Sequence, residues 1–227
     1  MDNTPKLSKS AIGTYDSCPH QYKLRYIMGM QPAPSPIMQR GTEIHDLCDT
    51  FFDGVNTMEG AVNKLLQSEL ALKYKDQMKN FISFIKHIGN GKFRTPLMKE
   101  KKFFNEEWNF TFISDAIYED DQGNLLLLDY KTGKTRGVSH HRFELAVYVF
   151  FTEILLNRKI KFWGILFLDE PDFSKAFDYE EVIPKEIEKA KLKIKNTRMK
   201  IRMEQFPKKP KYGCEWCGFY GNGCEGK

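Results

Sequence analysis

Three charged side chains lie within or directly after two apolar segments of the sequence. Asp129 and Lys131 follow the four leucines at 125–128, and Asp115 lies in the apolar segment just before them, at 109–119. Carboxylate oxygens are hard ligands for Mg²⁺ and Mn²⁺, and a neighbouring lysine can orient a water molecule or neutralise developing negative charge. Two acids and a lysine gathered at one strand end therefore indicate metal-dependent hydrolysis of a phosphodiester bond. An ordinary ion pair is the alternative, because a DxK triplet is a short and common motif.

The apolar runs predict the elements that position these side chains. Residues 125–131 form a buried strand and 109–119 a second strand, joined by a hairpin turn at 120–124. Side chains alternate along a strand, so the acid and the lysine of the DxK triplet project from the same face. Pairing of the two strands then brings Asp115 close to Asp129.

The remaining pattern alternates between helices and strands. The predicted helices open at Leu7–Ile12, with Ser8 or Ser10 as N-cap, and continue at 19–28, 38–52, 57–87, 141–157 and 184–205. The further predicted strands cover 97–104, 160–168 and, at an edge of the sheet, 176–183. We expect one domain with a mainly helical N-terminal region (8–95), a catalytic sheet core (96–183) and a basic helix with a cysteine-rich tail (184–227).

The composition is that of a globular chain that needs no disulfide framework. Its 227 residues are 41% hydrophobic and include 18 Phe and 10 Tyr, which is enough to bury a sizeable core. The N-terminus lacks an apolar signal-like region, and the most apolar stretch, 146–156, is interrupted by Thr152 and Glu153. We therefore expect neither a secretory signal nor a membrane span, and a reducing cytoplasmic location.

Positive charge is spread unevenly along the chain. The formal net charge is +5, and residues 185–211 hold eleven Lys or Arg against three Glu. A basic segment of this kind can follow a phosphate backbone, although a solvated helix face explains it equally well. The loop at 132–139 adds two more bases, Lys134 and Arg136.

Cysteines near the C-terminus form a second candidate site. Cys214, Cys217 and Cys224 make a CxxC followed by a third cysteine, which indicates a metal site in a reducing compartment. Tetrahedral sulfur sites have four ligands. Cys18, at a helix joint before a proline, is a better fourth ligand than Cys48, which lies in the middle of a predicted helix. Zinc and an iron-sulfur cluster both fit this spacing.

Three polar side chains on predicted helices can reach the acidic site. His45 lies four residues after a glycine, with Arg40 beside it, and can serve as a metal ligand; a packed or surface histidine is the alternative. Glu144 and Tyr148 are also four residues apart. They share one face of the helix that follows the DxK strand, so they either line the site or are an exposed glutamate and a half-buried tyrosine.

Taken together, these segments resemble the RecB-like nucleases of the PD-(D/E)xK superfamily. Within it they are most similar to the branch with a four-iron, four-sulfur cluster, which includes CRISPR-associated exonucleases and helicase-nuclease subunits. The resemblance runs from residues 10–19 to Cys224 and includes 40–45, Asp115 and 129–133. It implies an α/β, restriction-endonuclease-like core in which helices flank a central mixed β-sheet. It also implies an N-terminal helical region and a C-terminal cysteine-ligated cluster tail.

The resemblance implies roles for individual residues. The implied ligands of Mg²⁺ or Mn²⁺ are His45, Asp115, Asp129 and the carbonyl group of Tyr130. Lys131 would position the attacking water, and Glu100 falls where the family often has a glutamate on the preceding strand. The implied ligands of the four-iron, four-sulfur cluster are Cys18, Cys214, Cys217 and Cys224, which would give the cluster a structural role.

Two positions depart from the family pattern. Glu144 and Tyr148 fall on the QxxxY motif, so that a glutamate replaces the glutamine and either adds a metal ligand or weakens DNA contact. Ser114 replaces a glycine that commonly precedes the acid, a change that we expect the fold to tolerate.

We therefore expect a Mg²⁺- or Mn²⁺-dependent deoxyribonuclease. The resemblance implies an exonuclease that acts on single-stranded DNA or DNA ends, in recombination, repair or processing, with DNA contacts from Lys134, Arg136 and Arg40. The alternative is a non-catalytic, nuclease-like DNA-binding subunit of a helicase or recombination complex, which the intact acids and lysine argue against. A third interpretation, a zinc-stabilised binding module, predicts a colourless protein.

Overall fold

The computed structural model describes residues 5–33, 35–90, 92–133, 135–210 and 213–226. The chain forms two compact units that interleave in sequence. Unit 1 comprises Met1–Pro36, Phe103–Phe112 and Glu188–Lys227, and unit 2 comprises Ile37–Lys102 and Ile113–Ile187. The domain plan expected from the sequence stays a prediction. In the described part of the chain, no helix is both long enough and apolar enough to cross a membrane.

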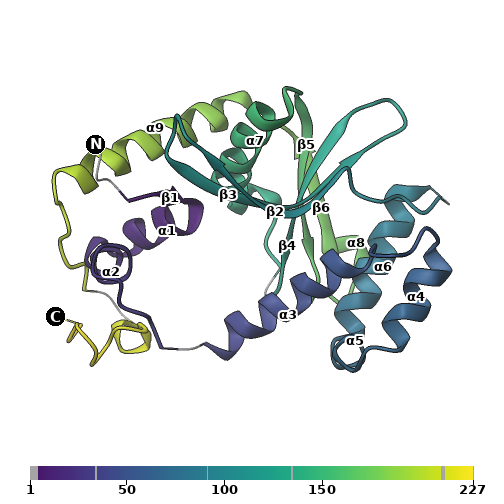
Figure 1. Ribbon diagram of the computed structural model, residues 1–227, viewed down its shortest axis with the longest axis horizontal. Helices are drawn as coiled ribbons and strands as arrows, with labels where there is room; N and C mark the ends of the chain where they lie inside the picture. Colours follow the sequence, from purple (N-terminus) through teal and green to yellow (C-terminus); the bar gives the residue numbers. More distant parts are fainter. Residues whose placement is uncertain (1–4, 34, 91, 134, 211–212, 227) are drawn as a thin grey trace. The chain divides into compact units, whose positions relative to one another are not determined.

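A mixed β-sheet forms the centre of unit 2 (Figure 1). Its strands, in spatial order, are β3 (Phe110–Glu119), β4 (Leu125–Lys131), β5 (Ile160–Phe167) and β6 (Phe177–Glu181), and β2 (Met98–Asn105) also pairs with β3. The β3–β4 and β5–β6 pairs are antiparallel, whereas β4 and β5 are parallel. This architecture confirms the predicted mixed sheet.

The turn between β3 and β4 is set by local side-chain hydrogen bonds. Asp120 Oδ1 accepts from the backbone N–H groups of Gln122 (2.9 Å) and Asn124 (2.8 Å). Gly123 has φ +81°, in the left-handed region that favours glycine. The predicted hairpin is therefore confirmed, and it fixes the register of the two strands that carry the acids.

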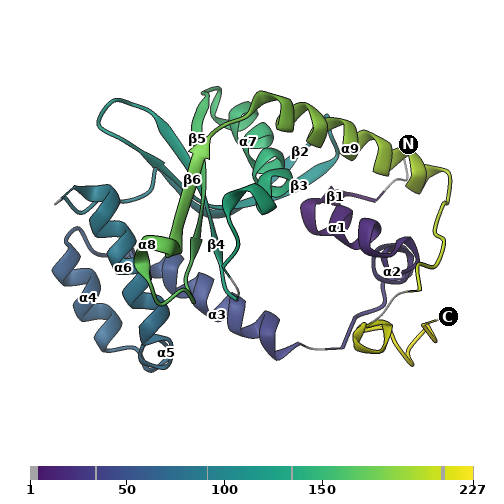
Figure 2. The same cartoon turned by 180° about the vertical axis from the view of Figure 1, so that it is seen from behind.

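Helices cover both faces of the unit 2 sheet. They are α3 (Pro36–Thr50), α4 (Met58–Leu66), α5 (Glu69–Lys73), α6 (Lys75–Gly89), α7 (Arg142–Leu156) and α8 (Phe173–Ala176), with a short 3-10 turn, η2 (Val138–His141), before α7. Figures 1 and 2 show α3 on one face of the sheet and α7 on the other.

The main hydrophobic core of unit 2 lies on the α3 side of the sheet. Leu128 and Tyr130 of β4 belong to it, and the Phe81 ring of α6 packs edge-on against Tyr130 with a centroid distance of 5.5 Å. Alternation along β4 places Leu127 and Asp129 on the opposite face, where α7 packs. β4 is buried on both faces, and its single acid, Asp129, therefore lies on the α7 side.

Two helical predictions need correction. Residues 57–87 form three helices. The Ser68 hydroxyl accepts from the Ala71 N–H group (3.2 Å) and starts α5, and the non-helical backbone of Tyr74 (φ −111°, ψ 33°) separates α5 from α6. The predicted helix over 19–28 is a short α-helix, α2 (Pro19–Tyr22), that continues as a π-helix, η1 (Lys23–Ile27).

The N-terminus of unit 1 begins with a short strand. Leu7 and Ser8 form β1, which pairs in parallel with Phe110 and Thr111, so Leu7 does not open a helix as predicted. The predicted N-cap is confirmed, because the Ser8 hydroxyl accepts from the Ala11 N–H group (3.1 Å) and caps α1 (Lys9–Ser17).

Unit 1 packs the two ends of the chain together. Besides α1, α2 and η1 it contains most of α9 (Pro184–Arg202) and the single turn η3 (Cys214–Trp216). The Tyr15 hydroxyl donates to the Gln205 carbonyl (2.5 Å), and the Ala33 N–H donates to the Gly218 carbonyl (3.1 Å).

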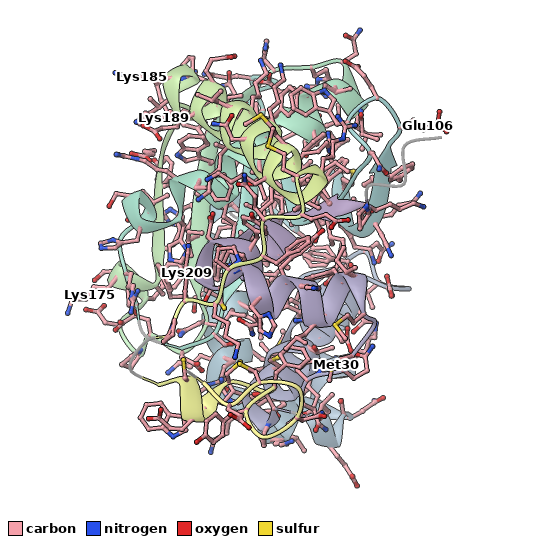
Figure 3. All side chains as sticks on the ribbon, turned by 90° about the vertical axis from the view of Figure 1, so that its left-hand side faces the viewer. Met30, Glu106, Lys175, Lys185, Lys189 and Lys209 are labelled. Atoms are coloured by element: carbon pink, nitrogen blue, oxygen red, sulfur yellow. The ribbon has the colours of Figure 1, made fainter. Side chains whose placement is uncertain are left out.

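Met30 also contacts the C-terminal tail (Figure 3). Gly223 has φ +90°, which favours glycine, and a Cβ atom there would lie 2.8 Å from the Met30 Cε atom, at the flexible end of that side chain. The tail is therefore seated against the N-terminal helices by both backbone and side-chain contacts.

Candidate active site

The two acids of the predicted site lie where β3 and β4 separate. The β3–β4 ladder runs from Glu119–Leu125 to Ala116–Leu128, so Asp115 and Asp129 occupy the next position beyond its last pair. Asp115 Oδ2 accepts from the backbone N–H of Tyr130 at 2.6 Å. The hairpin register therefore brings the two acids together, as the sequence pattern predicts.

Asp115 is part of a three-residue donor group that can hold a metal ion. One ligand atom each from His45 of α3, Glu100 of β2 and Asp115 of β3 lie within 4.8 Å of one another. The Nδ1 atom of His45 lies 3.5 Å from Asp115 Oδ1. One imidazole nitrogen and two carboxylates suit a divalent cation such as Mn²⁺, and the two carboxylates suit Mg²⁺. The residues therefore fit the implied cation.

The charges of this group perturb one another. Burial disfavours the charged form of His45, but the hydrogen bond and charge of Asp115, with Asp129 and Glu100, outweigh it and raise the pKa of His45. Burial and the charge of Asp115 raise the pKa of Glu100. Negative charge is therefore concentrated here and is only partly balanced, as in a site built to receive a cation.

Lys131 lies between two carboxylates at the end of β4. Its Nζ atom is 2.6 Å from Asp129 Oδ2 and 3.0 Å from Glu144 Oε1, where Glu144 belongs to the first turn of α7. Asp129 is 3% exposed, so its pairing with the ammonium group is largely shielded from water. The structure thus brings the whole DxK motif and Glu144 together.

Tyr148 lies one helical turn beyond Glu144. Its hydroxyl donates to Glu144 Oε1 at 3.4 Å. Burial and the negative charges of Asp129, Asp115 and Glu100 raise the pKa of Tyr148 well above its ordinary value. The phenol therefore stays neutral at physiological pH and serves as a hydrogen-bond donor.

Asp169 is a residue that the sequence reasoning missed. Its carboxylate accepts from Arg40 Nη1 (2.9 Å) and Nη2 (2.5 Å), from Gln77 Nε2 (2.7 Å) and from the Gly133 N–H (2.6 Å). It thereby ties α3, which carries His45, to α6 and to the loop that follows Lys131. The sequence signal for Asp169 is an acid directly after an apolar strand. This signal does not identify the residues that Asp169 contacts.

Two of the three predicted DNA-contact residues lie in the described part of the chain. Arg40 is paired with Asp169, so its charge is partly neutralised within unit 2. Arg136 is exposed on the loop before α7. Lys134 lies outside the described residues. The DNA-contact roles of these three residues stay predictions.

Four cysteines of unit 1 line one cavity. Cys18, at the joint of α1 and α2, shares a cavity of about 220 Å³ with Cys214, Cys217 and Cys224. All four thiols are free of disulfide bonds. Cys48 lies elsewhere, buried in the unit 2 core. The four implied ligands are therefore brought together and the fifth cysteine is not, which fits a metal group held by thiolates.

Comparisons with known proteins agree with this geometry. The family model described as the PD-(D/E)XK nuclease superfamily matches residues 6–221. The fold is similar to a crystal structure titled "Putative exonuclease" from Eubacterium rectale, with a TM-score of 0.53 and 11% sequence identity over 95% of this chain and 86% of that chain. The structure of SSO0001 aligns more loosely, with a TM-score of 0.38 and 15% identity over 82% of this chain and 95% of that chain.

The search of curated proteins found no match. Family membership therefore rests on the family model, which spans nearly the whole chain, and the sheet, the flanking helices and the position of the acids agree with it. The chain belongs to the PD-(D/E)XK nuclease superfamily.

Proposed function

We propose that this nuclease is a metal-dependent deoxyribonuclease that acts as an exonuclease on single-stranded DNA or DNA ends. The observation that carries the proposal is the adjacency of two sets of residues. His45, Glu100 and Asp115 form a cation-sized donor group, and Asp129 and Lys131 lie at the same end of the sheet. A nuclease of this kind needs both a cation site and a positive group beside it.

In this proposal each residue has a defined task. His45, Glu100 and Asp115 hold Mg²⁺ or Mn²⁺, with Asp129 and the Tyr130 carbonyl as further ligands. When bound, the cation supplies Lewis-acid chemistry, polarising a phosphoryl oxygen and lowering the pKa of a water molecule.

Lys131 donates from Nζ to the attacking water or to a phosphoryl oxygen whose negative charge grows as the water oxygen bonds to phosphorus. The attacking water releases one proton to solvent as its oxygen bonds to phosphorus, the bond between phosphorus and the leaving oxygen breaks, and the leaving oxygen takes a proton from solvent. Glu144 aims Lys131 at the site, because it accepts a hydrogen bond from the ammonium group.

Two observations support DNA as the substrate. The chain belongs to a nuclease superfamily, and α9 carries exposed lysines such as Lys185 and Lys189, four residues apart on the helix (Figure 3). Positive charge of this kind binds the phosphate backbone without reading sequence. The likeness in fold to a protein titled an exonuclease supports action at DNA ends.

The test is digestion of end-labelled DNA. Single-stranded and double-stranded DNA of one sequence are incubated with Mg²⁺, Mn²⁺ or EDTA, and the products are resolved by length. We expect cleavage with either metal, stepwise loss from ends, and no cleavage with EDTA. Lys131→Ala should abolish cleavage and leave DNA binding largely intact. Failure to degrade any DNA would instead favour a non-catalytic, nuclease-like subunit of a helicase or recombination complex.

We also propose that Cys18, Cys214, Cys217 and Cys224 hold a four-iron, four-sulfur cluster that fastens the tail to the N-terminal helices. The cavity that the four cysteines share supports a group held by thiolates. The resemblance to the cluster-binding branch of the superfamily favours the cluster over a single zinc ion.

Colour and iron content test this assignment. The purified protein should be brown, and Cys18→Ser should lose both the visible absorbance and the iron. Cys48→Ser is the matched control, because Cys48 is buried away from the cavity and should leave the cluster unchanged. A colourless protein containing one zinc ion would contradict the proposal.

A further inference from the structure

Two exposed aromatic rings border the cysteine cavity of unit 1. Trp216 is 73% exposed and Tyr220 is 52% exposed, and both line the cavity that holds the four cysteines. The other tryptophans of the chain are more enclosed, with Trp163 at 0% exposure and Trp108 half-buried. Large aromatic side chains left in water at one place indicate a binding surface.

Each of the two rings lies against a glycine whose φ is positive, a conformation that favours glycine. Gly213 has φ +90°, and a Cβ atom there would lie 3.1 Å from Cε3 of Trp216. Gly226 has φ +76°, and a Cβ atom there would lie 3.1 Å from Cε2 of Tyr220. Each ring therefore has one edge close to the backbone of the tail, while more than half of its side chain is exposed to solvent. Little further ordering is needed for such rings to bind a planar partner.

A lysine from the preceding segment reaches the same cavity. Lys209 lines it, and its Nζ atom donates to the Asp16 carbonyl at 2.9 Å, which holds the ammonium group close to the last turn of α1. Lys208 beside it is exposed. The tail also carries two acids, Glu215 and Glu225, so the surface is not strongly positive. Contact area there comes from the rings more than from charge.

We propose that Trp216 and Tyr220 form a stacking platform for unpaired bases of single-stranded DNA, with Lys209 beside a phosphate. Sequence-independent single-strand binding combines aromatic faces on which bases stack with positive groups along the backbone. Bases of an intact duplex are stacked inside the helix and cannot reach the rings. The platform therefore gives the proposed nuclease its preference for single strands, and the inference rests on the proposed function.

Binding of a thymidine oligonucleotide tests the platform. The probe is about 12 to 16 nucleotides long, in the range of single-strand site sizes, and its anisotropy is followed without added divalent metal so that it is not cleaved. Trp216→Ala and Tyr220→Ala should each weaken binding about 5- to 150-fold. Trp216→Phe keeps a stacking face and should bind within about threefold of wild type. Binding to a duplex of matched length should be unchanged in all three variants.

Tyr179→Ala is the matched control. Tyr179 of β6 is 53% exposed, nearly the same as Tyr220, but it lies in unit 2 and does not line the cysteine cavity. The Tyr179→Ala variant should bind the oligonucleotide with the same affinity as the wild-type protein. Visible absorbance is recorded for every variant to show that the tail is still folded around its metal.

The wild-type protein supplies a second test that needs no substitution. An oligonucleotide carrying 5-iododeoxyuridine is irradiated with the protein, and the crosslinked peptide is identified by mass spectrometry. Crosslinks to Trp216 or Tyr220 support the platform. The platform is refuted if crosslinks are found only outside 213–226. It is also refuted if the alanine variants bind within twofold of wild type, and the rings would then be assigned to binding a protein partner.

The outcomes separate this inference from the proposed function. Wild-type protein that cleaves DNA while the ring variants bind the oligonucleotide normally would refute the platform alone. Ring-dependent binding in a protein that cleaves no DNA with either metal would refute the nuclease proposal alone.

Discussion

The Nζ atom of Lys131 lies 3.0 Å from Oε1 of Glu144, and this pair joins β4 to the first turn of α7. The family motif that Glu144 resembles has a glutamine, which offers the same kind of hydrogen-bond acceptor without a negative charge. The glutamate therefore differs from a glutamine in its charge: it pairs with the Lys131 ammonium group and adds one negative charge beside it.

Glu144→Gln should increase the affinity for DNA. The change removes one negative charge from a side chain that is only 12% exposed and keeps its shape. We expect KM for DNA to fall about three- to tenfold at low salt, a change of about 1 kcal/mol, with kcat within about threefold of wild type. Steady-state cleavage at two salt concentrations measures this, and the gain should shrink as salt screens the charge.

Glu153→Gln is the control for this prediction. Glu153 lies on the same helix, is 15% exposed and pairs with Lys159, so the same chemical change there should leave both constants unaltered. A loss of kcat of more than about 100-fold in Glu144→Gln would show instead that Glu144 binds the metal or transfers a proton.

The sequence predicted the acidic site because its signals are local. Asp129 and Lys131 are two residues apart on one strand, and the hairpin that brings Asp115 to them spans few residues, so turn residues and alternation were enough. The partner of Arg40 could not be found in this way. Asp169 is 129 positions away, and only the packing of α3 beside the end of β5 brings the two together.

The same contrast holds for the fold. The apolar strand β4 and the capped helix α1 were predicted because their determinants lie inside the segments. The two-residue strand β1 was missed because it exists only through pairing with Phe110 and Thr111. The break between α4 and α5 depends on Ser68, whose capping bond competes with an uninterrupted amphipathic pattern.

Glu100→Gln should weaken metal binding. Glu100 supplies one of the three donor atoms that lie within 4.8 Å of one another, so loss of its charge should raise the Kd for Mn²⁺ at least about tenfold, or about 1.4 kcal/mol. Titration followed by calorimetry or by the Mn²⁺ spectrum, without DNA, measures it. Glu106→Gln is the control, because Glu106 is exposed on the turn between β2 and β3, in unit 1 (Figure 3).

In the absence of metal, Glu100→Gln should be more stable than the wild-type protein. Burial and the charge of Asp115 raise the pKa of Glu100, so its ionised form opposes folding at neutral pH. Urea unfolding in EDTA should show a higher midpoint for Glu100→Gln. An unchanged Mn²⁺ affinity would remove Glu100 from the ligand set and favour Asp129 as the third ligand.

Asp169→Ala should destabilise unit 2 and lower activity together. The substitution removes the carboxylate that pairs with Arg40 and that accepts hydrogen bonds from Gln77 and the Gly133 N–H. Because the pair is partly exposed, we expect a loss of about 2–3 kcal/mol in the free energy of unfolding, measured by urea denaturation. Glu188→Ala removes an exposed ion pair with Lys191 and should cost less than about 0.5 kcal/mol.

The contribution of Asp169 should disappear in acid. Burial raises the pKa of Asp169, but hydrogen bonds from Arg40, the Gly133 N–H and Gln77 outweigh it and lower that pKa below its ordinary value of 3.8. A group whose pKa is lower in the folded state stabilises the fold above its unfolded pKa, and this stabilisation is lost as the pH falls through the folded value. The difference in unfolding free energy between wild type and Asp169→Asn should therefore be largest above about pH 5 and shrink toward about pH 3. Comparing the two proteins cancels the titration of the other carboxylates, because distant sites contribute additively. A difference that stays constant over this range would show that uncharged hydrogen bonds, and not the carboxylate charge, hold α3 to the loop after Lys131.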